Sequence, residues 1–395
     1  MSTANSLEAA RLLDQARAMA GGLEDFGDPS FRPGLEQLCR ALNAEAHLSA
    51  QGHATFDQKL TAQLANRLWM EDAIRRHPEI LEETIAPPLI IVGLPRTGTT
   101  KLHRLLSRDP RFYWMAFWES QMPVPLPGEP IDDPSPRIKQ GQAIVDMMTN
   151  AMPELMAIHP MENLEADEEF MLMEHSFLAD FNAYAHIPRY MAWLATQNER
   201  PAYDLLIRML QYLQWQKRQR GISAQRWILK APHHLHRMAL LLQAFPDACV
   251  VQTHRDPVES IPSIASFVHT LHAIYSDSPD AKAVGATWSA RMRGGLEHTM
   301  AVRDQAQGSH NFVDVAFKDT VTQPLQVVET LYTAIGWDIA PATREAMAQW
   351  LQADAEHHAQ NAHRYSAEGF GLSPEGLKQD FARYIARHLR ELRAI

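Results

Sequence analysis

The fold is decided by one stretch of sequence, LIIVGLPRTGTT at residues 89–100. Its first four residues form a continuous apolar run, which is typical of a strand buried on both faces. Gly93 and Gly98 then enclose a loop, and Thr99 to Ser107 is predicted to form a helix. A strand, a glycine-bounded loop and a helix in this order make the frame of a P-loop, whose backbone N–H groups and helix dipole hold an anion.

One position of this loop departs from the P-loop of nucleoside triphosphatases. In those proteins a Lys follows the second Gly and neutralises the terminal phosphates, whereas here the residue is Thr99. The loop is therefore expected to hold a nucleotide without a γ-phosphate, with Arg96 supplying positive charge from inside it. An ordinary βα turn that contains glycines is the alternative interpretation.

Three later segments show the same order of strand and helix. Strands are predicted at 227–229, 248–253 and 312–317, and a helical stretch follows each. This alternation predicts a parallel sheet with right-handed crossovers. The fold class is therefore expected to be α/β, with a P-loop-type parallel sheet flanked by helices.

Two regions lie outside this alternation. Residues 1–86 have helical apolar spacing and are expected to form a helical N-terminal extension that packs on the core. Residues 87–395 would form the P-loop α/β domain, interrupted by an insertion at about 108–225 that is rich in Met, Trp and Phe. The insertion is expected to place helices over the carboxyl edge of the sheet, where ligands of open α/β sheets bind.

Composition excludes several classes of protein. The formal net charge of the 395 residues is -10, which disfavours nucleic acid and anionic membranes as partners. Cys39 and Cys249 form no disulfide framework or thiolate cage, and no stretch reaches the roughly 20 apolar residues that span a bilayer. With no secretory signal at the N-terminus, the expected location is the cytoplasm. A homo-oligomer stays open.

Two motifs together resemble one known family. The hexapeptide PRTGTT at residues 95–100 resembles the 5′-phosphosulfate loop of sulfotransferases that use PAPS (3′-phosphoadenosine 5′-phosphosulfate). The strand at 248–253 leads to Arg255, and Ser263 follows with the spacing of that family's 3′-phosphate motif. An Arg and a hydroxyl so placed can converge on one phosphate, although a surface Arg and a helical Ser are the alternative for this pair alone. The chain thus resembles a bacterial branch of PAPS-dependent sulfotransferases over about residues 87–335.

The resemblance implies a reaction and a set of partners. A sulfuryl group would pass from PAPS to the hydroxyl of a small-molecule acceptor, giving PAP and a sulfate ester, with no metal. The apolar insertion favours a hydrophobic alcohol, a phenol or a lipid as acceptor. Two other functions stay open, namely a kinase of nucleotides or small molecules on the same scaffold and a non-catalytic nucleotide-binding protein.

The resemblance also assigns residues to the nucleotide. Arg96 stands where many family members have a Lys that contacts the bridging oxygen, so its role would be electrostatic. His363 and Arg364 are expected to close over the donor or acceptor. The full set implied for the co-substrate is Arg96, Thr97, Gly98, Thr99, Thr100, Arg255, Ser263, His363 and Arg364.

The general base has three candidates. Glu119, in the sequence FWE, matches a catalytic Glu of some branches; its aromatic neighbours are expected to raise its pKa, and a helix-capping role is the alternative. His233, in LKAPH at residues 229–233, stands one residue later than the His of the family's Lys-x-His, and Lys230 would stabilise the transferring group. His159 is the third.

Two further patterns receive structural interpretations. The acidic run from Glu162 to Glu169 is interpreted as the solvated N-terminus of a helix. The chain has 19 histidines, but neither 233–236 nor 357–363 shows the spacing of a metal motif or a thiolate partner. No metal site is predicted.

Overall fold

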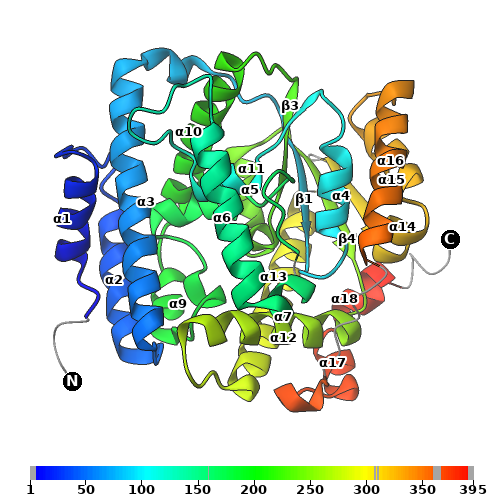
Figure 1. Ribbon diagram of the computed structural model, residues 1–395. Helices are drawn as coiled ribbons and strands as arrows, with labels where there is room; N and C mark the ends of the chain where they lie inside the picture. The colour runs from blue at the N-terminus through cyan, green and yellow to red at the C-terminus, as the bar shows by residue number, and fades with distance from the viewer. Residues whose placement is uncertain (1–5, 159, 307, 309–310, 359–365, 390–395) are drawn as a thin grey trace.

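A parallel sheet lies at the centre of the molecule, with helices on both sides (Figure 1). The computed structural model describes residues 6–158, 160–306, 308, 311–358 and 366–389. Within these ranges the sheet has five strands in the order β2-β3-β1-β4-β5, and every neighbouring pair is parallel. The strands are β1 (Leu89–Gly93), β2 (Phe112–Tyr113), β3 (Arg226–Lys230), β4 (Cys249–His254) and β5 (Asn311–Ala316).

The α/β prediction is confirmed, and the four predicted strands are β1, β3, β4 and β5. The central strand β1 is buried along its whole length. Ile90 and Val92 belong to one hydrophobic core, and Leu89 and Ile91 belong to a second. Because successive side chains of a strand point to opposite faces, β1 needs apolar residues at each position when both faces are covered.

The N-terminal helices share the larger core with the rest of the chain. They run along one side of the molecule in Figure 1. Arg67 of the third helix is buried, and its guanidinium donates to the carbonyl oxygens of Phe26, Asp28 and His175 at 2.9, 2.8 and 3.1 Å. The bond to His175 joins the N-terminal region to the insertion. The helices are α1 (Ala9–Met19), α2 (Phe31–Glu45), α3 (Ala50–Arg76) and the 3₁₀ helix η2 (Pro78–Glu82).

The insertion is mainly helical, as expected, but it also contributes the short edge strand β2. Its helices are α5 (Phe117–Gln121), α6 (Ser135–Ala151), α7 (Pro153–Ile158), α8 (Phe170–Met173), η3 (Glu174–Ser176), η4 (Phe181–Ala183), α9 (Pro188–Leu194) and α10 (Arg200–Gln219).

The remaining helices are α4 (Thr99–Leu106), η5 (Pro232–His236), α11 (Met238–Ala244), α12 (Pro257–Tyr275), α13 (Ala281–Ala306), α14 (Phe317–Thr322), α15 (Pro324–Ala334), α16 (Pro341–His358), η6 (Glu368–Phe370), α17 (Pro374–Asp380), α18 (Ala382–Tyr384) and the π-helical turn η7 (Ile385–Leu389). Among them, α4, α15 and α16 contribute to the core on the second face of the sheet, whereas η5, α11, α12, α13, α17 and α18 contribute to the larger core. Across the described ranges, no helix combines the length and apolar character that a membrane crossing requires.

Candidate active site

The glycine-bounded loop joins β1 to α4 at the carboxyl edge of the sheet. Gly93 has φ +156, and a Cβ there would lie 2.2 Å from Oγ1 of Thr253. Gly98 has φ +83, and its Cβ would lie 2.6 Å from Oγ1 of Thr320. Both positions therefore require glycine for space as well as for conformation. Arg96, between them, is itself left-handed at φ 69, a conformation that costs a non-glycine residue free energy.

Thr97 fixes the loop to the neighbouring strand. Its hydroxyl is fully buried and donates to the carbonyl oxygen of Leu94 at 2.6 Å. The same Oγ1 lies 2.6 Å from Oγ1 of Thr253 on β4. The Thr97 hydroxyl is thus engaged within the protein, so a contact from this residue to a phosphate group would have to use its backbone N–H.

Arg255 lies directly against this loop, which brings together the two motifs that sequence analysis singled out. Its guanidinium donates to the carbonyl oxygen of Arg96 at 2.8 Å and pairs with Glu259 at 3.1 Å. It also lies over the ring of Phe317, 4.2 Å from the centroid. Ser263 is buried in α12, beyond Pro262.

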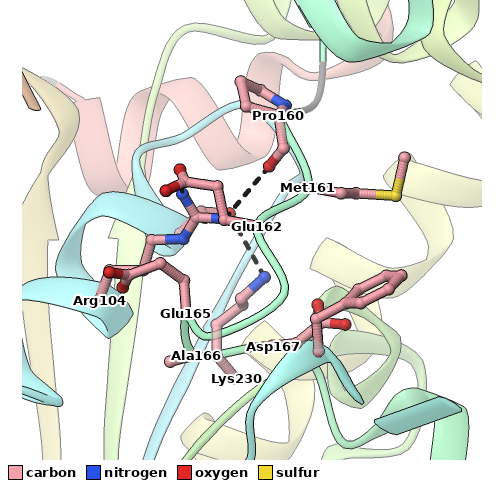
Figure 2. Close-up of a pocket in the computed structure, with 10 residues that line it drawn as sticks. Arg104, Pro160, Met161, Glu162, Glu165, Ala166, Asp167 and Lys230 are labelled. Atoms are coloured by element: carbon pink, nitrogen blue, oxygen red, sulfur yellow. Dashed lines mark hydrogen bonds and ion pairs between the residues drawn. The ribbon is translucent and has the colours of Figure 1, made fainter. Parts of the chain in front are cut away.

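Lys230 ends β3 on the other side of β1, so its side chain reaches the start of α4. Its ammonium lies 3.3 Å from Oγ1 of Thr100 and forms an ion pair with Glu168. In Figure 2 the side chains of Lys230 and Arg104 point toward the same small pocket, which the segment 160–167 covers. A positive charge and a hydroxyl therefore meet where the N-terminus of α4 favours an anion.

His233, in η5, is held by a buried carboxylate. Nδ1 of His233 lies 2.7 Å from Oδ2 of Asp180. The Asp180 carboxylate also forms ion pairs with Arg291, through Oδ2, and with Arg237, through Oδ1 at 3.3 Å. Nε2 of His233 is buried and has no hydrogen-bond partner among the described residues. Asp180 thus fixes the tautomer that carries the proton on Nδ1 and leaves the lone pair of Nε2 available.

The environment of His233 keeps its imidazole unprotonated. Burial lowers the pKa of His233 to about 4, although Asp180 opposes this change. Burial alone would raise the pKa of Asp180, but Arg237, Arg291 and His233 hold it well below its ordinary value. Because two guanidinium groups already neutralise the carboxylate, it does not keep the imidazole protonated. His233 is therefore a neutral imidazole near pH 7.

Comparison with known proteins identifies the family. A sequence model described as "Sulfotransferase family" matches residues 87–341, which is more than half of the chain. The chain belongs to the sulfotransferase family. The match begins just before β1 and includes the loop, Lys230, His233 and Arg255.

Two solved structures and one relative agree with the assignment of this chain to the sulfotransferase family. The crystal structure of sulfotransferase STF1 from Mycobacterium tuberculosis is 30% identical, with a TM-score of 0.82 over 96% of this chain and 99% of that one. STF9 from Mycobacterium avium, at 24% identity, shares the fold with a TM-score of 0.84 over 98% of both chains. The omega-hydroxy-beta-dihydromenaquinone-9 sulfotransferase Stf3 of Mycobacterium bovis is 25% identical over 342 residues, covering 82% of this chain and 81% of the relative.

Glu119 has a different environment from the one expected of a base in this sulfotransferase. It is buried, with its carboxylate 2.6 Å from Nζ of Lys217 and 2.9 Å from Nη2 of Arg220. Burial raises its pKa, but these two cations outweigh burial, so the pKa is lowered and the expected upward shift is wrong. The carboxylate also accepts a hydrogen bond from the backbone N–H of Ala116 at 3.0 Å. This contact is the helix-capping role that was the alternative interpretation of Glu119.

The acidic run does precede a helix, with Glu169 as the N-cap of α8, but the expectation that the run is solvated is wrong. The run lies in a non-helical segment before α8, and each carboxylate has a partner in the protein. Two of the partners are Arg104 of α4 and Arg108 just after its C-terminus, since both side chains face this segment. The contacts are Glu162 with Arg104, Glu165 with Arg108, Asp167 with Ser120, Glu168 with Lys230, and Glu169 with His234. The base candidate His159 lies outside the described residues.

Histidines that sequence analysis considered as ligands do not converge in the described part of the chain. His233 binds Asp180, whereas His234 binds Glu169 and Tyr203. His363 and Arg364, expected to close over the site, fall outside the described ranges, and nothing can be read of the side chains of His357 and His358.

A different group does converge. Ligand atoms of His254, Asp314 and His388 lie within 4.8 Å of one another. Arg303, however, donates to both carboxylate oxygens of Asp314, at 2.6 and 2.7 Å. The carboxylate that a cation would need is therefore already paired with a guanidinium.

Proposed function

We propose that this protein transfers a sulfuryl group from PAPS to the hydroxyl of a hydrophobic small molecule, giving PAP and a sulfate ester without a metal. One observation carries the proposal. Arg255 donates to the carbonyl oxygen of Arg96, so the anion-binding loop and the cation expected at the 3′-phosphate are neighbours. The chain's membership of the sulfotransferase family supplies the reaction class.

The residues at the carboxyl edge fit a bisphosphorylated nucleotide better than a triphosphate. Thr99 replaces the P-loop Lys, while Lys230 reaches Thr100 from the neighbouring strand. The 5′-phosphosulfate would lie at the loop and the start of α4, and Arg255 with Ser263 would take the 3′-phosphate. Arg96 and Lys230 would offset the negative charge on the transferring group through their basic side chains.

We assign the general base to His233 and orientation of its ring to Asp180. The acceptor oxygen forms the new bond to sulfur, and the acceptor proton passes to Nε2 of His233. The bond between sulfur and the bridging oxygen breaks, so that PAP leaves with that oxygen. The unpartnered Nε2 and the neutral state of the ring support this role. We give Glu119 a structural role, because two buried cations already bind its carboxylate.

A hydrophobic acceptor is supported by one relative. The name of Stf3 specifies a hydroxylated dihydromenaquinone, which is a lipid alcohol. The composition of the insertion agrees, since it is rich in Met, Trp and Phe.

Calorimetric titration with PAP and with ATP plus Mg²⁺ tests the donor. We expect PAP to bind at least tenfold more tightly, and we expect Arg255→Ala to weaken PAP binding at least tenfold because a charge-assisted contact to phosphate is lost. Arg189→Ala is the matched control, because the Arg189 side chain is 83% exposed. Tighter binding of ATP would favour the kinase alternative. Tight PAP binding without any sulfated product over an acceptor panel would favour the non-catalytic alternative.

A further inference from the structure

A groove lies beside η5, outside the residues so far assigned to the reaction. It has a volume of about 380 Å³, which is within the range of pockets that hold small molecules. Its apolar lining comes from Ile187, Pro188 and Met191 at the start of α9 and from Val284 and Trp288 of α13. Figure 1 shows α9, α12 and α13 in the same half of the molecule. The walls are apolar, so the groove favours an apolar occupant.

Small side chains keep the groove open to solvent. Thr287, Ala290 and Gly294 are exposed positions on one side of α13, and all three line the groove. A Cβ added at Gly294 would meet no atom within 4 Å. Larger residues at these helix positions would narrow the opening, so the existing small ones leave space for a molecule to enter.

Polar atoms at the inner end of the groove lack partners. Asn182 is only 5% exposed, and its Oδ1 has no hydrogen-bond partner among the described residues. Nε2 of His236 is also buried without a hydrogen-bond partner among the described residues. Both residues line the groove. A buried polar atom without a partner is unfavourable, so a hydroxyl or another polar group of a ligand would be stabilised at this end.

The inner end of the groove adjoins the proposed base. His236 and His233 are three residues apart in the 3₁₀ helix η5, where residues with this spacing lie on the same face. Arg291, which lines the groove, forms an ion pair with Asp180, and Asp180 holds His233. The polar end of the groove is therefore next to the Asp180–His233 pair, and its apolar walls extend away from it.

We propose that this groove binds the apolar body of the acceptor, with the polar end of the molecule directed toward η5. The proposal rests on the proposed sulfotransfer function, which it deepens by assigning the residues that select the acceptor. Ile187, Met191 and Trp288 would set the preference for an extended hydrocarbon chain. His236 and Asn182 would hydrogen-bond its hydroxyl as the molecule binds, before the proton passes to Nε2 of His233 in the reaction.

The probes are linear primary alcohols from 1-hexanol to 1-decanol, titrated into the full-length protein in the presence of PAP. Each added methylene that enters an apolar groove is expected to raise affinity by up to about fourfold. Gly294→Leu places a side chain in the opening and should weaken 1-decanol binding at least tenfold. Gly294→Ala is the matched control and should bind within twofold of the unchanged protein, since a single methyl leaves the opening free.

Both replacements favour the helix, so a loss of binding would not reflect loss of the fold, and thermal denaturation checks this. Affinity that does not change with chain length, or equal 1-decanol binding by Gly294→Leu and the unchanged protein, would overturn the groove proposal. PAP titration of the same samples separates the two hypotheses. If alcohols bind in the groove but PAP does not bind, the groove stands as a ligand site and the sulfotransfer proposal fails. If PAP binds and alcohols do not, the groove proposal fails and the assignment of the donor site stands.

Discussion

Replacement of His233 by Gln tests the assignment of the base. The amide keeps a polar side chain of similar length but cannot accept the acceptor's proton. Because a positioned general base contributes about 100- to 10,000-fold, we expect kcat to fall by that factor, or about 3–5 kcal/mol of transition-state stabilisation. PAP binding should be unchanged, since His233 is not among the residues assigned to the nucleotide.

The pH dependence provides an independent check. Burial lowers the pKa of His233 to about 4, so roughly 97% of the imidazole is neutral at pH 5.5. An ordinary His with a pKa of about 6.5 would be only about 9% neutral there. The unprotonated form is the base, so activity is lost as pH falls through the folded-state pKa. We therefore expect kcat/KM to be nearly constant from pH 8 to 5.5.

The assay measures sulfated product by mass spectrometry at saturating PAPS, with the best acceptor from a panel of alcohols and phenols. His77→Gln is the matched control, because the His77 side chain is 41% exposed and distant in sequence from the site. The reasoning is refuted if His233→Gln turns over normally, or if kcat/KM falls about tenfold between pH 7.5 and 5.5 while the protein stays folded.

Further predictions concern stability and the loop. Glu119→Gln leaves two buried cations without a counter-charge and should lower the unfolding free energy by about 3–5 kcal/mol. Glu162→Gln removes an ion pair whose Glu side chain is 56% exposed and should change the unfolding free energy by less than about 1 kcal/mol. Urea unfolding measures both changes, and equal effects would contradict the structural role assigned to Glu119. Burial lowers the pKa values of His103 and His175 to about 3, so below pH 6.5 the unfolded state binds more protons than the folded state. Each of the two histidines should therefore lower the unfolding free energy by about 2 kcal/mol between pH 7.5 and pH 5. Unchanged midpoints of urea unfolding at the two pH values would show this prediction to be wrong. Gly93→Ala should abolish PAP binding in calorimetry while the protein remains folded, since its Cβ would lie 2.2 Å from Thr253 Oγ1, and full affinity would count against the loop geometry.

Features that depend on neighbours in sequence could be predicted. The strand β1, the loop and α4 are contiguous, and their apolar run and glycines carry the information locally. The strands β3, β4 and β5 were found in the same way, from shorter apolar runs each followed by a helical stretch. The strand β2 has only two residues, Phe112 and Tyr113, so no alternating pattern could reveal it.

Features that depend on residues distant in the sequence could not be predicted. Asp180 had no motif to mark it, and its partner His233 is 53 residues away. Lys217 lies 98 residues from Glu119, so the effect of its charge on that carboxylate was invisible, and the aromatic neighbours suggested the opposite pKa shift. The contact between Arg104, Arg108 and the segment 160–169 could have been predicted from charge. The two arginines are four residues apart, about one helical turn, and the segment contains a run of acidic residues.

A crystal structure with PAP bound tests the central claim most directly. The account predicts the 5′-phosphate at the N-terminus of α4, within hydrogen-bonding distance of Thr100 Oγ1 and Lys230 Nζ, and the 3′-phosphate in contact with the Arg255 guanidinium. PAP bound elsewhere, or bound at the loop with its 3′-phosphate away from Arg255, would contradict it.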